Sequence, residues 1–343
     1  MKAFLQRKGI EPSFHQYVVK ALSFMALGLF SSLIIGLIME TVGEQLVSPF
    51  YEPAGEALIS MGQLAMDLSG PAIGIAVAYG LGAPRLVLFS ALVSGAAGGE
   101  LAGPAGSFLA ALLSTEIGKL VSQETKLDII VTPFVTIASG WTAAMLVGPP
   151  IGEGIRQFGI FIMWATEQQP FIMGVLVAVL MGLALTAPIS SAAIAFMLEL
   201  EGVAAGAATV GCAAQMMGFA ASSYRENGVS GVIALGLGTS MLQIANIAKN
   251  PRILLPPTLA AAVIGPLTTV VFVMENNPAG AGMGTSGLVG PIMTIRTMGT
   301  EQFVWFGIIS LQIVGPALVS LIFSEWFRRI GWIRPGDMAI EKS

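Results

Sequence analysis

The chain has 343 residues, of which 55% are hydrophobic and only 10% are charged, and its mean hydropathy is +0.81. Soluble domains carry roughly 25% charged residues, so this composition argues against a water-soluble domain. Basic residues are few and scattered, which argues against nucleic-acid binding, and a single cysteine cannot form an intrachain disulfide. We therefore expect an all-α polytopic protein of the lipid bilayer.

Apolar segments follow one another along almost the whole chain. Long windows without Asp, Glu, Lys or Arg reach the roughly twenty residues that cross a bilayer. Together with three shorter windows they predict about ten membrane-embedded helices in one integral membrane domain, some of them discontinuous or re-entrant. The long windows are 21–39, 129–152, 168–198, 202–224, 227–248, 253–274 and 302–324, and the shorter ones are 68–84, 86–99 and 101–115.

Basic residues gather at both ends of the chain, outside the first and last apolar windows. Because segments rich in lysine and arginine stay in the cytoplasm, we expect both termini to be cytoplasmic and the number of full crossings to be even. The residues concerned are Lys2, Arg7, Lys8 and Lys20 at one end and Arg328, Arg329 and Arg334 at the other.

A weak internal repeat divides the chain near residue 165. Three pairs of matching segments occur in the same order, with offsets that shrink as expected if the second copy has shorter loops. Two-fold repeats are typical of transporters with a solute site at the middle of the membrane, so we predict two halves, 1–165 and 166–343. The matches are Gly28 and Gly36 with Gly174 and Gly182, Gly70 and Gly74 with Gly202 and Gly206, and DIIVTP with RILLPP.

The segment MENNPAGAGMGTSG, residues 274–287, is the first candidate for a solute site. Its glycines and proline disfavour a regular helix, and irregular backbone at membrane depth occurs where it lines a cavity or is buried in protein. The carboxylate of Glu275 can accept hydrogen bonds from sugar or polyol hydroxyls, with Asn276, Asn277, Thr285 and Ser286 completing a polar cradle. The alternative is that Glu275 only marks a helix end.

Other polar residues inside apolar windows extend this candidate site. Gln243 and Asn246 are three residues apart and would share one helical face, so we expect both to approach the solute. Gln215 must find a partner, either on a neighbouring helix or on a bound solute. In the first half, Glu100 lies in the Gly/Pro-broken stretch GAAGGELAGPAG and is a further predicted contact.

Two local patterns have simpler structural explanations. Glu116 and Lys119 are spaced i,i+3, which favours a local ion pair. The stretch YRENG predicts a turn in which Asn227 and Gly228 are suited to positive φ.

At this point several segments together suggest a family. GAATVGCAAQMMGFA, RENG, GTSMLQ, KNPRI, PPTLA, MENNPAGAGMGTSGLVGP and GWIRPGD resemble the membrane-spanning IIC components (EIIC) of the bacterial phosphotransferase system, and within them the stand-alone perfringolysin-regulator-like branch. The resemblance implies a permease fold in the bacterial inner membrane, a homodimer, and a sugar-like solute bound near discontinuous helices. It also implies cytoplasmic phosphotransferase or regulatory proteins as partners.

The departures from that family pattern are equally specific. The chain has neither of the soluble domains that carry the phosphorylated histidine and cysteine, and Glu275 is the nearest equivalent of the glutamate-proline signature. We expect no catalytic residues, no metal site and no cofactor. Three functions stay open: a permease for a small polar solute, a non-transporting sensor or regulator that retains the fold, and a passive channel.

Overall fold

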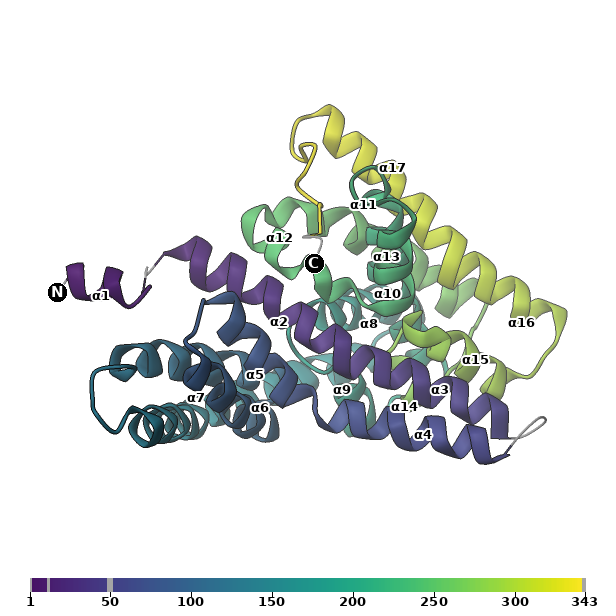
Figure 1. Cartoon of the computed structure of the whole chain (residues 1–343). Coiled ribbons are helices and arrows are strands. Elements are labelled where there is room, and N and C mark those ends of the chain that lie inside the picture. The colour runs from purple at the N-terminus through teal and green to yellow at the C-terminus, as the bar shows by residue number, and fades with distance from the viewer. Residues whose placement is uncertain (1, 11–12, 48–51, 341–343) are drawn as a thin grey trace. The chain divides into compact units, whose positions relative to one another are not determined.

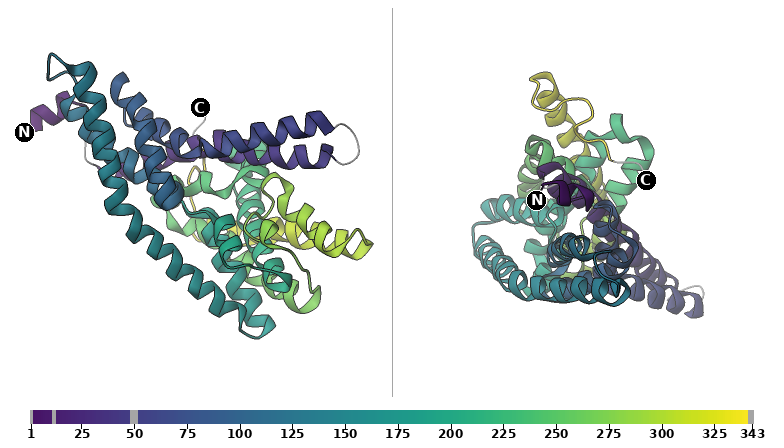
Figure 2. Two further views of the ribbon diagram at one scale, coloured as in Figure 1. Left: turned by 90° about the horizontal axis from the view of Figure 1, so that it is seen from below. Right: turned by 60° about the vertical axis from the view of Figure 1, so that its left-hand side comes forward.

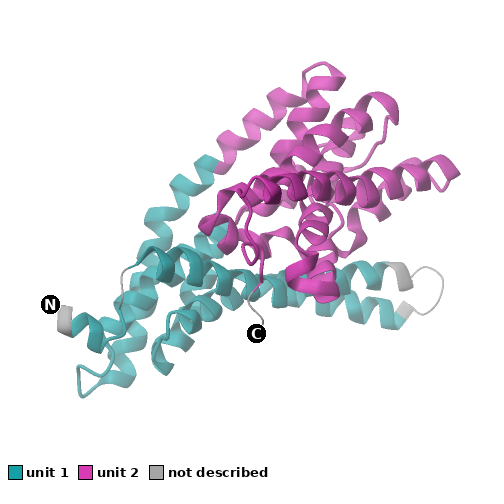
Figure 3. Cartoon of the chain, turned by 90° about the horizontal axis from the view of Figure 1, so that it is seen from above, with its two compact units in different colours: residues 1–154 teal, residues 155–343 magenta. Residues whose placement is uncertain are grey.

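The computed structural model describes residues 2–10, 13–47 and 52–340. The chain forms two compact units, Met1–Gly154 and Ile155–Ser343 (Figure 3). Helix α7 (Asp128–Thr166) runs through the boundary between them. The division near residue 165 that the repeat suggests concerns sequence similarity and stays a prediction.

The first unit begins with a short helix, α1 (Lys2–Arg7), and then a long apolar one, residues 15–44, that pairs with α4 (Glu52–Asp67). The last part of the long helix is α3 (Ile35–Val47), which lies beside α4 in Figures 1 and 2. Glycines meet along this contact, since a Cβ on Gly36 would lie 2.6 Å from the carbonyl oxygen of Gly62. Small residues allow such close packing where lipid removes the hydrophobic drive between helices. The segments of the long helix before α3 are η1 (His15–Lys20), α2 (Ala21–Leu29) and η2 (Phe30–Ile34).

Helix α5 (Ser69–Gly80) packs on α6 (Arg85–Val121), which is broken in the middle. At Gly103 the backbone takes φ 59° and ψ −151°, a conformation that favours glycine, and Pro104 follows. The two arms of α6 fold back on each other, and a 2.8 Å hydrogen bond from the Ser107 hydroxyl to the Gly95 carbonyl joins them. The break confirms the expected discontinuous helix around GAAGGELAGPAG.

The far end of α6 is fixed to the N-terminal segment by charged groups. Lys119 is buried and forms the expected ion pair with Glu116 at 2.9 Å, while its ammonium also donates to the Gly9 carbonyl at 2.9 Å. In the loop after α6, Glu124 pairs with Arg7 at 2.7 Å and with Lys8. The hydrogen bond from Lys8, and then the charge of Arg7, lower the pKa of the exposed Glu124 carboxyl.

The second unit is built around α10 (Gly202–Ser222), whose side chains are almost all buried. Helices α8 (Pro170–Thr186), α13 (Leu255–Pro266) and α17 (Gly315–Arg329) pack against it. A Cβ on Gly182 of α8 would lie 2.6 Å from the Gly211 carbonyl oxygen. The many glycines and alanines of α10 are therefore required by close helix contacts.

Short helices and turns connect these four helices within the second unit. They are α9 (Ser191–Met197), α11 (Tyr224–Ile233), η3 (Ala234–Gly238), η4 (Ser240–Gln243), α12 (Ile244–Lys249), η5 (Pro251–Leu254), η6 (Leu267–Val271), α14 (Pro278–Ala281), η7 (Ser286–Leu288), α15 (Val289–Met298), α16 (Gln302–Gly307) and η8 (Ile308–Val314).

Six helices in the described part of the chain are long and apolar enough to cross a membrane, and α8 is a shorter apolar helix. One of the six is α6, whose break at Gly103 makes it two arms. The fold is therefore that of an all-α polytopic membrane protein, as the composition predicts. Cys212 is a fully buried free thiol in α10.

Candidate functional site

The MENNPAGAGMGTSG segment lies in the second unit between η6 and α15, and its backbone is largely unwound. Val273, Gly284, Gly287 and Leu288 all have positive φ, between 46° and 61°. The backbone N–H of Asn276 donates to the Gly202 carbonyl at 3.1 Å, so the segment lies against the first turn of α10. The unwound backbone that glycine and proline predict is confirmed.

Close backbone packing holds this segment against α10. The carbonyl of Met274 contacts Gly206, where a Cβ would overlap it, and Gly284 touches the backbone of Cys212 and Ala213. The glycines of α10 therefore allow close packing of the unwound segment as well as of the neighbouring helices. The segment restarts as a helix at Asn277, whose side chain caps α14 by accepting from the Gly280 N–H at 3.2 Å, with Pro278 in the first turn.

Asn276 is the polar centre of the segment and is 1% exposed. Its amide nitrogen lies 2.8 Å from the Thr209 hydroxyl, 3.1 Å from the Gly290 carbonyl and 3.1 Å from the Thr294 hydroxyl. Its amide oxygen accepts the N–H of Asn277 at 2.9 Å. Asn276 therefore ties the unwound segment to α10 and α15 at once.

Gln312 of η8 extends this network. Its amide nitrogen donates to the Thr294 hydroxyl at 2.9 Å, and the side chain is 2% exposed. Its amide oxygen has no hydrogen-bond partner among the described residues. A buried acceptor of this kind is a place for an ordered water or a bound polar group. The sequence analysis does not identify Thr209, Thr294 or Gln312. For Gln312 a signal exists, because it is a lone amide in an apolar window, as Gln215 is.

Glu275 lies next to this network but on its outer side, where it is exposed. Its backbone N–H points at the Met298 sulfur at 3.1 Å, and within the described residues its carboxylate has no hydrogen-bond or ion-pair partner. Asn277 is half-buried beside it, and its amide nitrogen is 3.3 Å from the Thr297 hydroxyl. Glu201, the exposed residue before α10, precedes Gly202 of the Gly202–Asn276 pairing.

The other predicted residues of the second unit are buried and bound to protein groups. The hydroxyls of Thr285 and Ser286 donate to the carbonyls of Gly236 at 2.6 Å and Gly238 at 2.8 Å. Gln215 donates to the Thr258 hydroxyl at 3.0 Å, so a neighbouring helix supplies its partner. These residues fix the backbone around α10 rather than facing an open space.

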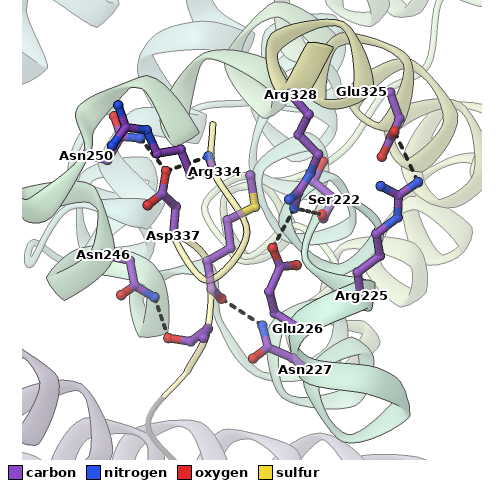
Figure 4. A network of polar contacts seen from close by, with 12 residues as sticks. Ser222, Arg225, Glu226, Asn227, Asn246, Asn250, Glu325, Arg328, Arg334 and Asp337 are labelled. Carbon is purple, nitrogen blue, oxygen red and sulfur yellow. Dashed lines mark hydrogen bonds and ion pairs between the residues drawn. The ribbon is translucent and has the colours of Figure 1, made fainter. Parts of the chain in front are cut away.

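Gln243 and Asn246 are together, as the spacing predicts, with a 2.8 Å hydrogen bond between their amides. Both are also bound to the segment that follows α17. Gln243 donates to the Met338 carbonyl at 2.9 Å. Asn246 donates to the Ala339 carbonyl at 2.9 Å (Figure 4). No hydrogen bond within the described residues joins either amide to Glu275.

Glu100 belongs to the first unit, where it lies just before the break in α6. It borders a cavity of about 270 Å³ together with Asp67, the last residue of α4, and with Ser69 and Ser107. Both carboxylates are exposed. That Glu100 and Asp67 line the same cavity was not predicted, because it depends on how α4, α5 and α6 fold together.

The second unit thus offers a carboxylate and an amide on a fixed, unwound backbone inside a helical membrane protein. Such discontinuous segments are where secondary transporters bind their solutes. The family of the phosphotransferase system EIIC matches residues 19–340, nearly the whole chain. A search of curated proteins returns no match. The chain belongs to the EIIC family of the phosphotransferase system, the membrane permease components of sugar transport that work with the cytoplasmic proteins of that system.

Proposed function

We propose that this EIIC protein binds and translocates a small polyhydroxylated solute, a sugar, polyol or sugar acid, at the unwound segment of the second unit. Glu275 and Asn277 make the direct contacts in this proposal. A carboxylate accepts hydrogen bonds from vicinal hydroxyls, and an amide both donates and accepts, so the pair can satisfy a hydroxylated ring edge.

The observation that carries the proposal is the contrast between Asn276 and Glu275. Asn276 is buried and saturated with protein partners, whereas the adjacent carboxylate has none among the described residues. The backbone that presents Glu275 is therefore fixed before any solute arrives, and a preorganised group loses less entropy on binding. An acidic group within the hydrocarbon region of a membrane is costly to insert, and such groups commonly serve a function.

The remaining predicted residues form two groups in this proposal, positioning residues and further solute contacts. Asn276, Thr285, Ser286 and Gln215 hold the segment and the core of α10 in place. Gln243, Asn246 and Glu100 stay predicted solute contacts for other states of the transport cycle. Alternating access moves repeats about a central site, which gives such residues a route to the solute.

Three further expectations belong to the same proposal. We propose a homodimer in the bacterial inner membrane, membership in the perfringolysin-regulator-like branch, and cytoplasmic termini. The resemblance of the sequence supports the first two, and the basic residues Arg328 and Arg329 in the last turn of α17 support the third.

The test is binding of a panel of sugars, polyols and sugar acids to the purified protein, read as thermal stabilisation. A solute at 100-fold above its dissociation constant stabilises by about 2.7 kcal/mol. We expect one class of the panel to stabilise the wild type and Glu301→Gln, a matched exposed carboxylate at the start of α16. The same solutes fail to stabilise Glu275→Gln. Equal stabilisation of Glu275→Gln and the wild type would place the solute elsewhere.

A further inference from the structure

The segment Trp332–Ile340, called the strap below, follows α17 and returns over α11 and α12 (Figure 4). Two of its side chains are buried, Ile333 at 1% and Met338 at 0% exposed. At its start the Trp332 ring stacks on Phe327 with centroids 5.2 Å apart, and the Arg252 guanidinium lies 5.5 Å from the Trp332 centroid. The strap is thus an ordered part of the second unit.

Amide side chains bind the strap mainly through its backbone. Asn227 donates to the Met338 carbonyl at 2.8 Å and accepts the Ile340 N–H at 2.8 Å. The carbonyl and the N–H that Asn227 binds belong to residues two apart in the strap, so one amide side chain satisfies both a backbone acceptor and a backbone donor of this stretch. Gln243 donates to the same Met338 carbonyl at 2.9 Å.

Asn250 holds the other end of the strap in the same way. Its amide nitrogen is 2.7 Å from the Asp337 carboxylate and 3.0 Å from the Trp332 carbonyl. Asp337 in turn accepts the backbone N–H of Arg334 at 2.8 Å, which closes a turn. Four amide side chains therefore bind the strap: Asn227, Gln243, Asn246 and Asn250.

The elements that the strap joins have little stability of their own. The backbone of α11 is non-helical at Gly228, with φ 61° and ψ −156°, directly after Asn227. Helix α12 has six residues, and it ends where Asn250 is extended. Isolated helices shorter than about 12 residues are marginal, so α12 depends on its tertiary contacts.

The same stretch contacts the candidate solute segment. The carbonyls of Gly236 and Gly238 in η3 accept the hydroxyls of Thr285 and Ser286. Gln243 and Asn246, a few residues later, bind the strap. The stretch from η3 to α12 thus contacts the unwound segment through η3 and the strap through Gln243 and Asn246.

We propose that the strap is a releasable peptide ligand of the amide-lined site, and that its binding holds α12 in place while its release loosens α12. Apart from the bond between Asn250 and the Asp337 carboxylate, the amide contacts are neutral hydrogen bonds to backbone groups that water can also satisfy. Each of these contributes modestly, so the bound and released states can exchange. Release also frees the amides of Gln243 and Asn246. The proposal does not depend on the identity of the solute.

The experiment is cysteine labelling of the full-length protein. Cys212 is fully buried, so an introduced cysteine gives a signal of its own. We expect Met338→Cys to react with a maleimide at least about 100-fold more slowly than the exposed Arg334→Cys, since reaction requires release. Adding Asn227→Ala removes two hydrogen bonds and should raise the Met338→Cys rate roughly 10-fold or more, whereas Gln168→Ala, an exposed amide bonded to Trp164, should leave it unchanged.

Hydrogen exchange on the protein without introduced cysteines gives the second readout. The Ile340 N–H, which Asn227 binds, should be protected and should lose protection in Asn227→Ala. Exchange in residues 244–249 should rise in the same variant, although no hydrogen bond of Asn227 in the described chain reaches α12. Equal labelling of Met338→Cys and Arg334→Cys would overturn the proposal. Unchanged exchange of α12 after the strap is released would overturn it as well.

Discussion

Replacing Asn276 by alanine tests whether this side chain holds the unwound segment. Its amide group has two hydrogens for three acceptors, Thr209, Gly290 and Thr294, so two of those bonds form at a time. With the bond from the Asn277 N–H to its oxygen, the substitution removes three hydrogen bonds. Such bonds contribute about 1 kcal/mol each in proteins and about 0.6 kcal/mol each in membrane helices.

We therefore expect Asn276→Ala to lower the free energy of unfolding by about 2–3 kcal/mol. The measurement is denaturant-induced unfolding in mixed micelles, compared with wild type and with Asn277→Ala. Asn277→Ala loses one helix cap, worth about 1 kcal/mol, and is the matched control. A change for Asn276→Ala of less than about 0.5 kcal/mol, or one equal to that of the control, would refute the reasoning, because the buried amide would then contribute no more than a surface side chain.

Two further predictions concern packing and pH. Gly206→Ala should prevent correct folding, because the added Cβ overlaps the Met274 carbonyl. Gly154→Ala, which has open space around the added Cβ, should fold normally. Size-exclusion chromatography distinguishes the two, since only the correctly folded variant elutes as a monodisperse peak. The pKa of Glu124 is lowered in the folded state by the Lys8 hydrogen bond, so the stabilisation it gives is present above its unfolded pKa and is lost as pH falls through the lowered value. The protection of residues 4–10 from hydrogen exchange, relative to the unfolded chain at the same pH, should fall in the wild type as the pH drops below the ordinary glutamate pKa of about 4.3. In Glu124→Gln this protection should already be reduced at pH 7, and no difference from the wild type at pH 7 would contradict the prediction.

The membrane fold could be predicted from the sequence because it depends on local properties. Apolar windows determine which segments can cross the membrane, and the glycines and prolines of 95–106 and 274–287 determine the backbone conformation of residues close to them in the sequence. Gly103 and the unwound segment before α14 lie where those patterns indicate. The structure confirms these features for that reason. Gly228 adopts the positive φ expected in YRENG, but Asn227 does not, and the expected turn is the first part of α11 with a kink at Gly228.

The contacts of the polar residues could not be predicted in the same way. Gln243 and Asn246 share a helical face as predicted, but their partners are backbone carbonyls about ninety residues later in the chain. Asn276 looks like Asn277 in the sequence, yet one is buried in a network and the other is half-buried at a helix start. Which amide faces protein and which faces open space is decided by tertiary packing around α10.

The central claim is that Glu275 serves a solute that crosses the membrane. The direct measurement is equilibrium exchange of the labelled solute found in the panel, with the protein reconstituted in liposomes. We predict saturable exchange by the wild type and by Glu301→Gln, and exchange reduced at least about 10-fold in Glu275→Gln, the loss expected when about 1.4 kcal/mol of binding is removed. Binding of the solute without any exchange would contradict the claim and identify the protein as a sensor, and exchange that never saturates would identify a channel.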